Sequence, residues 1–137
     1  MLRPNQFRAN EAWIAFQLNG APIDTETDGS FNCFALMDAA SCLILCSELF
    51  PATAAEPSKG EVRRLLKQAS AHKGELPVKL FVPVGQFATI LPAEARRQGL
   101  TVVRASEDEL ALFIGEARTG FEEYVSGKRC GNLSPNG

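Results

Sequence analysis

The stretch FNCFALMDAASCLILCSELF, residues 31–50, decides the fold. It contains two apolar runs, residues 31–37 and 42–50, which are separated by the short segment 38–41. A connection of about four residues is typical of a hairpin, so the two runs are predicted to pair as antiparallel strands. Because both runs are almost continuously apolar, we expect two central strands in a sheet that helices cover on both faces.

A further strand is predicted upstream of the hairpin. Residues 13–18 are rich in aromatic and β-branched residues and end at the turn-forming pair Asn19-Gly20. Residues 21–30 contain acidic and turn-forming residues and predict an exposed connection, the most mobile loop of the chain. The chain is therefore expected to begin with three strands.

Downstream of the hairpin, helix and strand signals alternate. Ser58 and Glu61 form an S-x-x-E capping box, which predicts a helix of about 14 residues that ends at Gly74. A buried strand is expected over residues 78–84, with Pro83 marking its end because proline donates no hydrogen bond to a ladder.

The alternation continues to the last predicted helix. Residues 86–98 are predicted to be helical, and Pro92 either kinks this helix or opens the second of two short pieces. A strand is expected over residues 100–104. A second S-x-x-E box, residues 106–109, then predicts a helix that runs to about Val125.

Length and composition predict one α/β domain over residues 1–137, with a core at about 11–126 and a frayed polar tail at 127–137. The formal net charge of -2 gives no field that would attract phosphate backbones, so nucleic acid is not the favoured partner. No run approaches the roughly 20 apolar residues that span a bilayer, so we expect a cytoplasmic protein that does not contact a membrane.

The cysteine pattern favours a reducing compartment. Cys33, Cys42 and Cys46 lie in or beside apolar runs, where a reduced cysteine packs as a small hydrophobic side chain. Cys42 and Cys46 are four residues apart, and the single histidine, His72, lies far away at a helix end. This spacing does not fit a tetrahedral zinc site, and we expect no metal and no cofactor.

The predicted order is three antiparallel strands followed by helix, strand, helix, strand and helix, in a mixed sheet. Over residues 11–126 this order resembles the ribonuclease H-like fold. The segments FALMD at 34–38, CLIL at 42–45 and LFVP at 80–83 resemble those of uncharacterised bacterial domains with that topology.

The resemblance implies a catalytic pattern that this sequence matches only in part. Nucleases of this fold hold two metal ions with carboxylates from the first strand, the first helix and the end of the fourth strand. Here the strand at 13–18 and the segment 82–85 contain no acid. Asp38 and Glu61 are the candidate catalytic carboxylates, and a third ligand is missing. Asp38 equally fits a turn residue that bonds its own backbone.

Two further groups of residues are candidate binding sites. Gly85 and Gln86, together with Ser106, lie where strands are expected to end, which is where open α/β sheets bind ligands. A glycine at such a place also simply permits a tight turn.

The second group is a basic helix face formed by Arg63, Arg64 and Lys67. It suits phosphate or an acidic partner, and an ordinary solvated face explains it as well.

Three functions therefore stay open. We favour a non-catalytic binding or assembly module whose partner is another protein or a second copy. The alternatives are a divergent metal-dependent nuclease that uses Asp38 and Glu61, and a small-ligand or nucleotide binder near Gly85 and Ser106.

Overall fold

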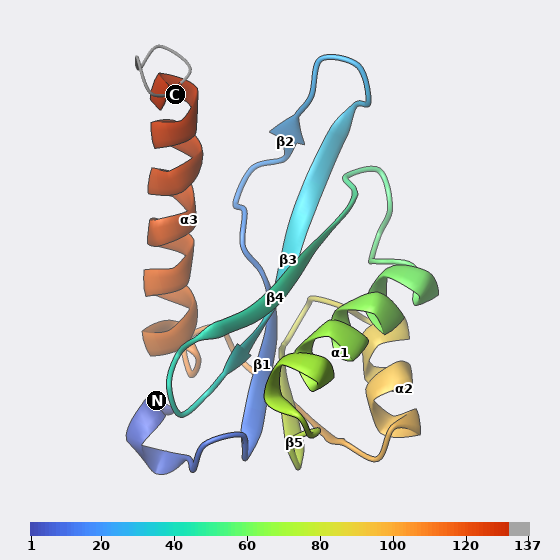
Figure 1. Ribbon diagram of the computed structural model, residues 1–137, viewed down its shortest axis with the longest axis vertical. Coiled ribbons are helices and arrows are strands. Elements are labelled where there is room, and N and C mark those ends of the chain that lie inside the picture. The colour runs from blue at the N-terminus through green and yellow to red at the C-terminus, as the bar shows by residue number, and fades with distance from the viewer. Residues whose placement is uncertain (132–137) are drawn as a thin grey trace.

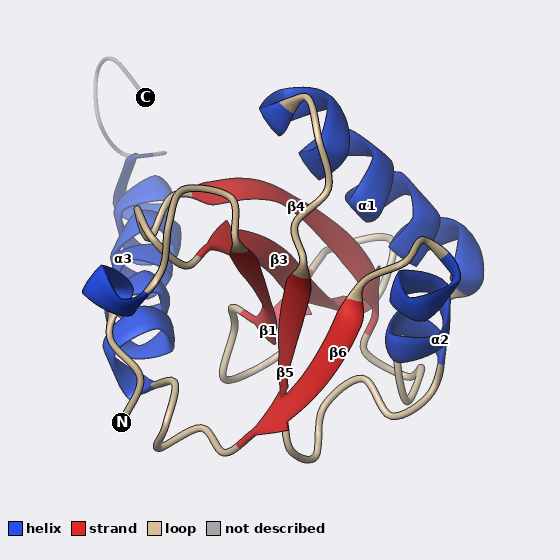
Figure 2. Ribbon diagram, turned by 90° about the horizontal axis from the view of Figure 1, so that it is seen from below, coloured by secondary structure: helices blue, strands red, loops and turns tan. Residues whose placement is uncertain are grey.

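The structure is a computed structural model that describes the backbone of residues 1–131 and the side chains of residues 1–124. A mixed sheet lies between helices on both of its faces (Figure 1, Figure 2). The strands are β1 (Ala12–Gln17), β2 (Ile23–Asp24), β3 (Ser30–Asp38), β4 (Ile44–Pro51), β5 (Lys79–Pro83) and β6 (Thr101–Ala105). The helices are α1 (Lys59–Lys73), α2 (Ile90–Arg97) and α3 (Ala111–Gly131), and a 3₁₀ turn covers Pro4–Gln6.

The pairing of the strands confirms the predicted mixed α/β sheet. β3 lies between β1 and β4 and is antiparallel to both, while β1, β5 and β6 are parallel neighbours in that order. The two-residue strand β2 pairs with the start of β3 inside the loop that was predicted to lack regular structure. The mobility expected for that loop stays a prediction.

Side chains of β1 point alternately to the two faces and thereby define two apolar layers. Trp13 and Ala15 pack in the layer under α1 and α2, whereas Ile14 and Phe16 pack in the layer under α3. All four are fully buried. The near-continuous hydrophobicity of this strand is therefore explained by helices on both sides.

α1 forms as the capping box predicts. The Ser58 hydroxyl accepts a hydrogen bond from the Glu61 N–H, and the Glu61 carboxylate accepts one from the Ser58 N–H. Gly74 ends the helix with a left-handed φ of 81°, which suits a residue without a Cβ. The buried face consists of Val62, Leu65, Leu66 and Ala69.

β4 is an edge strand, so the prediction of two central strands was right for β3 and wrong for β4. Leu45 and Phe50 of β4 are buried in the layer that includes α1. Two other apolar residues of β4, Ile44 and Leu49, are however 37% and 49% exposed. An apolar run alone does not distinguish a strand that is covered on both faces from an edge strand that is covered on one.

The helix predicted over residues 86–98 is shorter than expected. Residues 84–89 form turns and a loop, and α2 begins at Ile90. Pro92 lies in the first turn of α2, where its missing N–H needs no helical partner. Neither alternative for Pro92 is observed, because residues 84–89 form no helical piece before the single helix α2.

α3 begins later and runs further than its sequence signals predict. The Ser106 hydroxyl accepts a hydrogen bond from the Glu109 N–H, but this contact holds a turn, and the helix starts at Ala111. It continues to Gly131, so residues 127–131 of the predicted tail are helical, and residues 132–137 lie outside the described part of the chain. Among residues 1–131, no helix is both long and apolar enough to cross a membrane.

Candidate functional site

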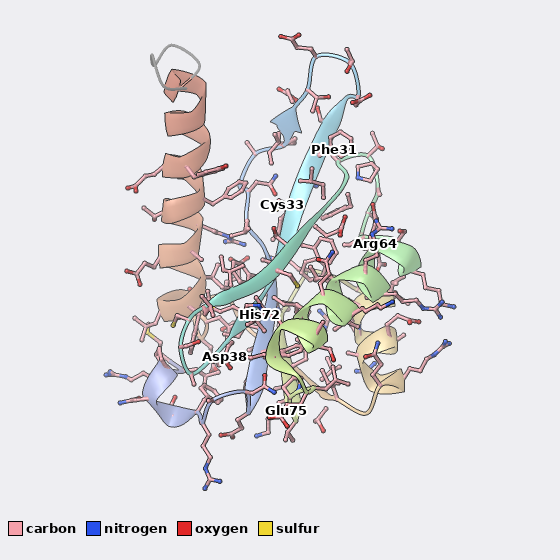
Figure 3. All side chains as sticks on the ribbon, in the orientation of Figure 1. Phe31, Cys33, Asp38, Arg64, His72 and Glu75 are labelled. Atoms are coloured by element: carbon pink, nitrogen blue, oxygen red, sulfur yellow. The ribbon has the colours of Figure 1, made fainter. Side chains whose placement is uncertain are left out.

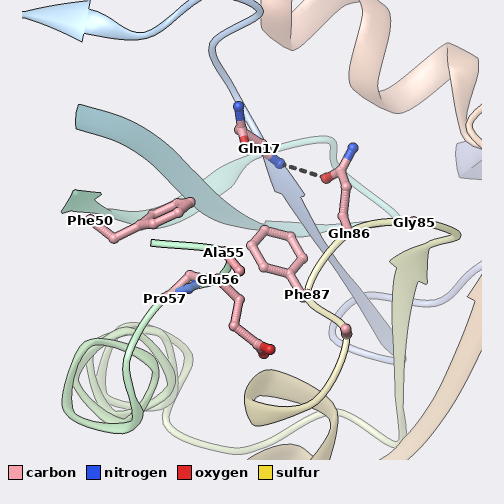
Figure 4. A pocket seen from close by; sticks show the side chains of 9 residues that line it. Gln17, Phe50, Ala55, Glu56, Pro57, Gly85, Gln86 and Phe87 are labelled. Atoms are coloured by element: carbon pink, nitrogen blue, oxygen red, sulfur yellow. Dashed lines mark hydrogen bonds between the residues drawn. The ribbon is translucent and has the colours of Figure 1, made fainter. Parts of the chain in front are cut away.

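The parallel strands β1 and β5 end side by side at one edge of the sheet. Gln17 is the last residue of β1, and Gln86 follows three residues after the end of β5. The Gln17 N–H donates to Gln86 Oε1 over 3.1 Å (Figure 4). Nucleases of the ribonuclease H-like fold carry carboxylates on the first strand and at the end of the fourth long strand. These two strands correspond to β1 and β5 in this chain, and their shared edge presents two neutral amides instead.

Four residues close a ring of hydrogen bonds at this edge, which we call the polar ring: Gln17, Gln86, Glu107 and Arg118. Gln86 Nε2 donates to Glu107 Oε2 over 3.1 Å, and an Arg118 guanidinium nitrogen donates to Glu107 Oε1 over 2.6 Å. Arg118 Nε donates to the carbonyl oxygen of Gln17 over 2.9 Å. With the bond from Gln17 to Gln86, each member is joined to two others.

The chemistry of the polar ring is that of a neutralised site. Its single carboxylate, Glu107, is paired with the Arg118 guanidinium, and its amides do not take up or release protons at ordinary pH. A hard cation such as Mg²⁺ is usually held by clustered carboxylate oxygens. Among the side chains of residues 1–124, no three His, Cys, Asp or Glu groups come together in a way that could hold a metal ion.

The loop after β5 is fixed by Arg104 of β6. The Arg104 guanidinium donates to the carbonyl oxygens of Pro83, Gln86, Phe87 and Ala88. This one side chain therefore satisfies acceptors along the whole turn.

Two residues of this loop adopt a left-handed backbone. Gly85 has a φ of 90° and Phe87 has a φ of 50°. This conformation is sterically unfavourable for Phe87, because it has a Cβ atom. The Phe87 side chain is nevertheless buried, and its ring lies 5.7 Å from that of Phe34. Burial of the ring and the hydrogen bonds to the loop carbonyls offset the backbone strain.

A small cavity of about 120 Å³ lies beside this loop (Figure 4). Gln17, Gln86 and Phe87 line it together with Phe50 and the segment 55–57. Small-molecule sites usually enclose roughly 300–1,000 Å³, so this volume is too small for a nucleotide.

Glu56, on the cavity wall, caps α2. Its carboxylate accepts hydrogen bonds from the Thr89 N–H over 3.0 Å and from the Ile90 N–H over 2.7 Å. Thr89 makes no side-chain cap of its own. A residue from the segment between β4 and α1 therefore satisfies the exposed amides at the start of α2.

Asp38 lies at the other end of β1, away from the polar ring. It pairs with Trp13 at the start of β1, and its carboxylate accepts hydrogen bonds from the Asn10 N–H and from the backbone and hydroxyl of Ser41. Lys73 Nζ lies 3.8 Å from its second oxygen. This environment is the turn role that the sequence analysis weighed against catalysis.

Asp38 and Glu61 are not brought together. Asp38 lies beside the last turn of α1, where Lys73 contacts it. Arg64, near the beginning of that helix, lies well apart from Asp38 in Figure 3. Glu61 lies in the first turn of α1, where its carboxylate completes the capping box. Twelve residues separate Glu61 from Lys73, which corresponds to about 18 Å along the helix axis.

The candidate ligand-binding residues do meet at one edge. The Val84 N–H donates to the Ala105 carbonyl oxygen over 2.9 Å, which brings the ends of β5 and β6 together. Gly85 and Gln86 therefore lie in the loop that faces the turn at Ser106. A ligand role for these residues stays a prediction.

The basic helix face divides into two environments. Arg63 Nε lies 2.7 Å from Glu94 Oε1 of α2, whereas Arg64 reaches over 3.5 Å to Glu48 of β4. Lys67 lines a groove between α1 and α2 together with Arg63. Only part of the predicted basic face therefore points into a concave surface.

The described cysteines are poor nucleophiles. Burial raises the pKa of the Cys46 thiol to about 11, and it also raises the pKa of Cys33. The pKa of Cys42 is raised by burial first and by the nearby Glu116 carboxylate second. These thiols pack as apolar groups, as their positions in the sequence suggest.

Sequence reasoning missed Gln17, Glu107 and Arg118 as members of the polar ring. Gln17 gives a faint signal, because it is a polar residue at the end of a strongly apolar strand. Glu107 is an ordinary acid in a predicted first turn. Arg118 meets Gln17 only across 101 positions of sequence, and no local pattern announces such a contact.

The sequence matches no protein-family model and no curated protein. Among solved structures, the fold resembles a chain of the simian T-cell lymphotropic virus intasome in complex with PP2A regulatory subunit B56 gamma, with a TM-score of 0.60 and 12% identity over 93% of this chain. This chain spans 43% of the length of that one.

The trimeric form of the HTLV-2 integrase catalytic core domain in complex with magnesium is also similar. Its TM-score is 0.50 and its identity 9%, over 86% of this chain and 73% of that one. At such identities the likeness concerns the fold alone. Together with the strand order, it confirms that the chain has a ribonuclease H-like fold.

Proposed function

We propose that this chain is a non-catalytic binding or assembly domain on a ribonuclease H-like scaffold, with another protein as its partner. The observation that carries the proposal is the polar ring. Where the nucleases of this fold cluster carboxylates, this chain has two glutamines and one glutamate that is paired with Arg118. Such a ring fixes strand ends to a helix, which is a structural role, and lacks the acidic oxygens that two metal ions need.

The two similar structures support a function in protein association. One is an intasome in complex with a PP2A regulatory subunit, and the other is a trimeric form of an integrase core. In this chain, the exposed apolar side chains of Leu43, Ile44 and Leu49 lie on and beside the edge strand β4. The resemblance to bacterial domains and the cytoplasmic location remain predictions.

A divergent metal-dependent nuclease is the second candidate. Glu107 supports it, because this carboxylate lies at the strand edge, and the similar integrase core is described in complex with magnesium. Metal binding there would require Glu107 to leave Arg118. The cavity of about 120 Å³ gives a nucleotide-binding function less support.

Cleavage of labelled single- and double-stranded DNA and RNA with Mg²⁺ or Mn²⁺ tests the proposal. We expect no metal-dependent cleavage by the wild-type chain. Glu107→Gln and Asp38→Asn are the informative variants, and Glu26→Gln, at an exposed position in the loop before β3, is the matched control. Cleavage that either informative variant abolishes would overturn the non-catalytic function.

A pull-down from a cell lysate, together with the solution mass from light scattering, tests the binding function directly. We expect a captured protein or a mass above that of the monomer. The double variant Leu43→Lys with Leu49→Lys then reports whether the exposed residues at β4 take part. A strict monomer that captures no protein would contradict the proposal.

A further inference from the structure

A groove between α1 and α2 carries an excess of positive charge. The groove is shallow and open to solvent, has a volume of about 490 Å³, and is lined by Arg63, Lys67, Ser70, Glu94, Arg97 and Gln98. Three cations and one carboxylate leave an excess of two positive charges in the lining. Lys59, one turn before Arg63 on α1, adds a further cation nearby.

The single carboxylate of the groove is already engaged. Glu94 is 4% exposed, and Arg63 Nε donates to it over 2.7 Å. The hydrogen bond from Arg63 is the main cause that holds the pKa of Glu94 below its usual value, and the charges of Arg97 and Lys59 act in the same direction. Glu94 therefore stays ionised and offsets only part of the positive charge around it.

Lys67 and Arg97 are the cations available to a partner. Within the described part of the chain, neither forms an ion pair with a carboxylate. Arg97 is exposed, and so is Lys67. They approach the groove from different helices, Lys67 from α1 and Arg97 from α2, so an acidic group between them would meet a cation on each side.

We propose that this groove binds an acidic segment of a partner protein. The inference rests on the proposed binding function and names the chemistry of the partner. From Arg63 to Ser70 the groove follows α1 for about 10 Å, which matches roughly three residues of an extended peptide. Acidic side chains of the segment reach Lys67 and Arg97.

The polar lining favours a peptide over a nucleic acid. Besides its charged residues, the groove is lined by Ser70 and Gln98, whose side chains can both donate and accept hydrogen bonds. A peptide backbone supplies both N–H donors and C=O acceptors to such groups, whereas phosphate groups supply acceptors only.

Fluorescence anisotropy at low ionic strength tests the groove with two probes of equal charge. One probe is a fluorescein-labelled, C-terminally amidated peptide of five Glu-Ser repeats, and the other is a labelled six-nucleotide oligothymidine with five phosphates. We expect the peptide to bind more tightly. We also expect Lys67→Glu with Arg97→Glu to weaken peptide binding by about tenfold or more, because both cations of the groove are reversed.

The matched control is Arg3→Glu with Arg8→Glu, which changes the net charge equally at exposed positions that do not line the groove. This control should bind the peptide within about twofold of the wild type. The milder pair Lys67→Gln with Arg97→Gln keeps the test valid if charge reversal disturbs folding, as judged by circular dichroism. Equal weakening by the control pair and the groove pair would overturn the proposal.

Two further outcomes would also overturn it. Tighter binding of the oligonucleotide, lost in the groove variant, would show that the occupant is a nucleic acid. A solution mass that falls in the groove variant would identify a second copy as the occupant. Cleavage that depends on Glu107 would instead refute the proposed function. The two failures can be told apart, because the groove substitutions change no residue of the polar ring.

Discussion

Arg118 Nε donates a hydrogen bond to the carbonyl oxygen of Gln17 over 2.9 Å, although 101 residues separate the two in sequence. The contact joins α3 to the end of β1. The same guanidinium is paired with Glu107, so one side chain holds both the first long strand and the turn before its own helix. The polar ring is therefore a tertiary clamp as well as the candidate site.

Replacing Arg118 tests this clamp. Arg118→Met should lower the free energy of unfolding by about 1–3 kcal/mol, because the carbonyl of Gln17 loses its donor and Glu107 loses its cation. Urea denaturation measures the change. Arg96→Met, at an exposed position of α2, is the matched control and should shift stability by less than about 0.5 kcal/mol. Equal effects of the two substitutions would refute the clamp.

The cap on α2 makes a second prediction. Glu56→Ala removes the acceptor for the Thr89 and Ile90 amides and should destabilise the chain by about 1 kcal/mol. Hydrogen exchange at these two amides should accelerate in the variant. Glu26→Ala, in the exposed loop before β3, is the control and should leave both amides protected. Unchanged exchange in Glu56→Ala would mean that the cap does not form in solution.

The ion pair of Arg63 with Glu94 should make stability depend on pH. Because the folded state holds the pKa of Glu94 below its usual value of 4.5, the carboxylate stabilises the fold above that value. This contribution is lost as pH falls through the lower folded pKa. Glu94→Gln should therefore be less stable than the wild type near neutral pH, and the difference should shrink below about pH 4.5.

Denaturation of both proteins across this pH range measures the effect. Glu122→Gln, on an exposed position of α3, provides the control. A stability difference between wild type and Glu94→Gln that is equally large in acid would contradict the assigned pKa shift.

The Cys46 thiol makes a prediction about reactivity. With a pKa of about 11 and a hydrogen bond to the Leu65 carbonyl, it should be almost fully protonated at pH 8. Alkylation by iodoacetamide, followed by peptide mass spectrometry, should be at least about tenfold slower in the folded protein than in urea. Equal alkylation rates in the two states would show that the Cys46 thiol is not buried and that its pKa is not raised.

The order of the main elements follows from local patterns, which explains why the sequence predicts the fold class. The capping box of Ser58 with Glu61 places α1, and the stop at Pro83 places β5, because each signal acts within a few residues. The edge position of β4 was missed since it depends on which strands lie beside it. The start of α2 was misplaced because Phe87 adopts a left-handed backbone that Arg104 supports from another strand.

The site was less predictable than the fold. Gln86 was selected because it follows a strand, but its partners Gln17 and Glu107 come from distant segments. The groove shows the same division. The sequence placed Arg63 and Lys67 on one helix face, and only the packing of α2 against α1 adds Arg97 from the second helix.

The long span between Gln17 and Arg118 has a consequence for biosynthesis. During translation, β1 is made well before α3, so the clamp cannot close until residue 118 has emerged from the ribosome. Until then, the end of β1 and the α3 face of the sheet remain open to chaperones. A nascent chain halted before that position would thus expose Ile14 and Phe16, which the finished protein hides completely.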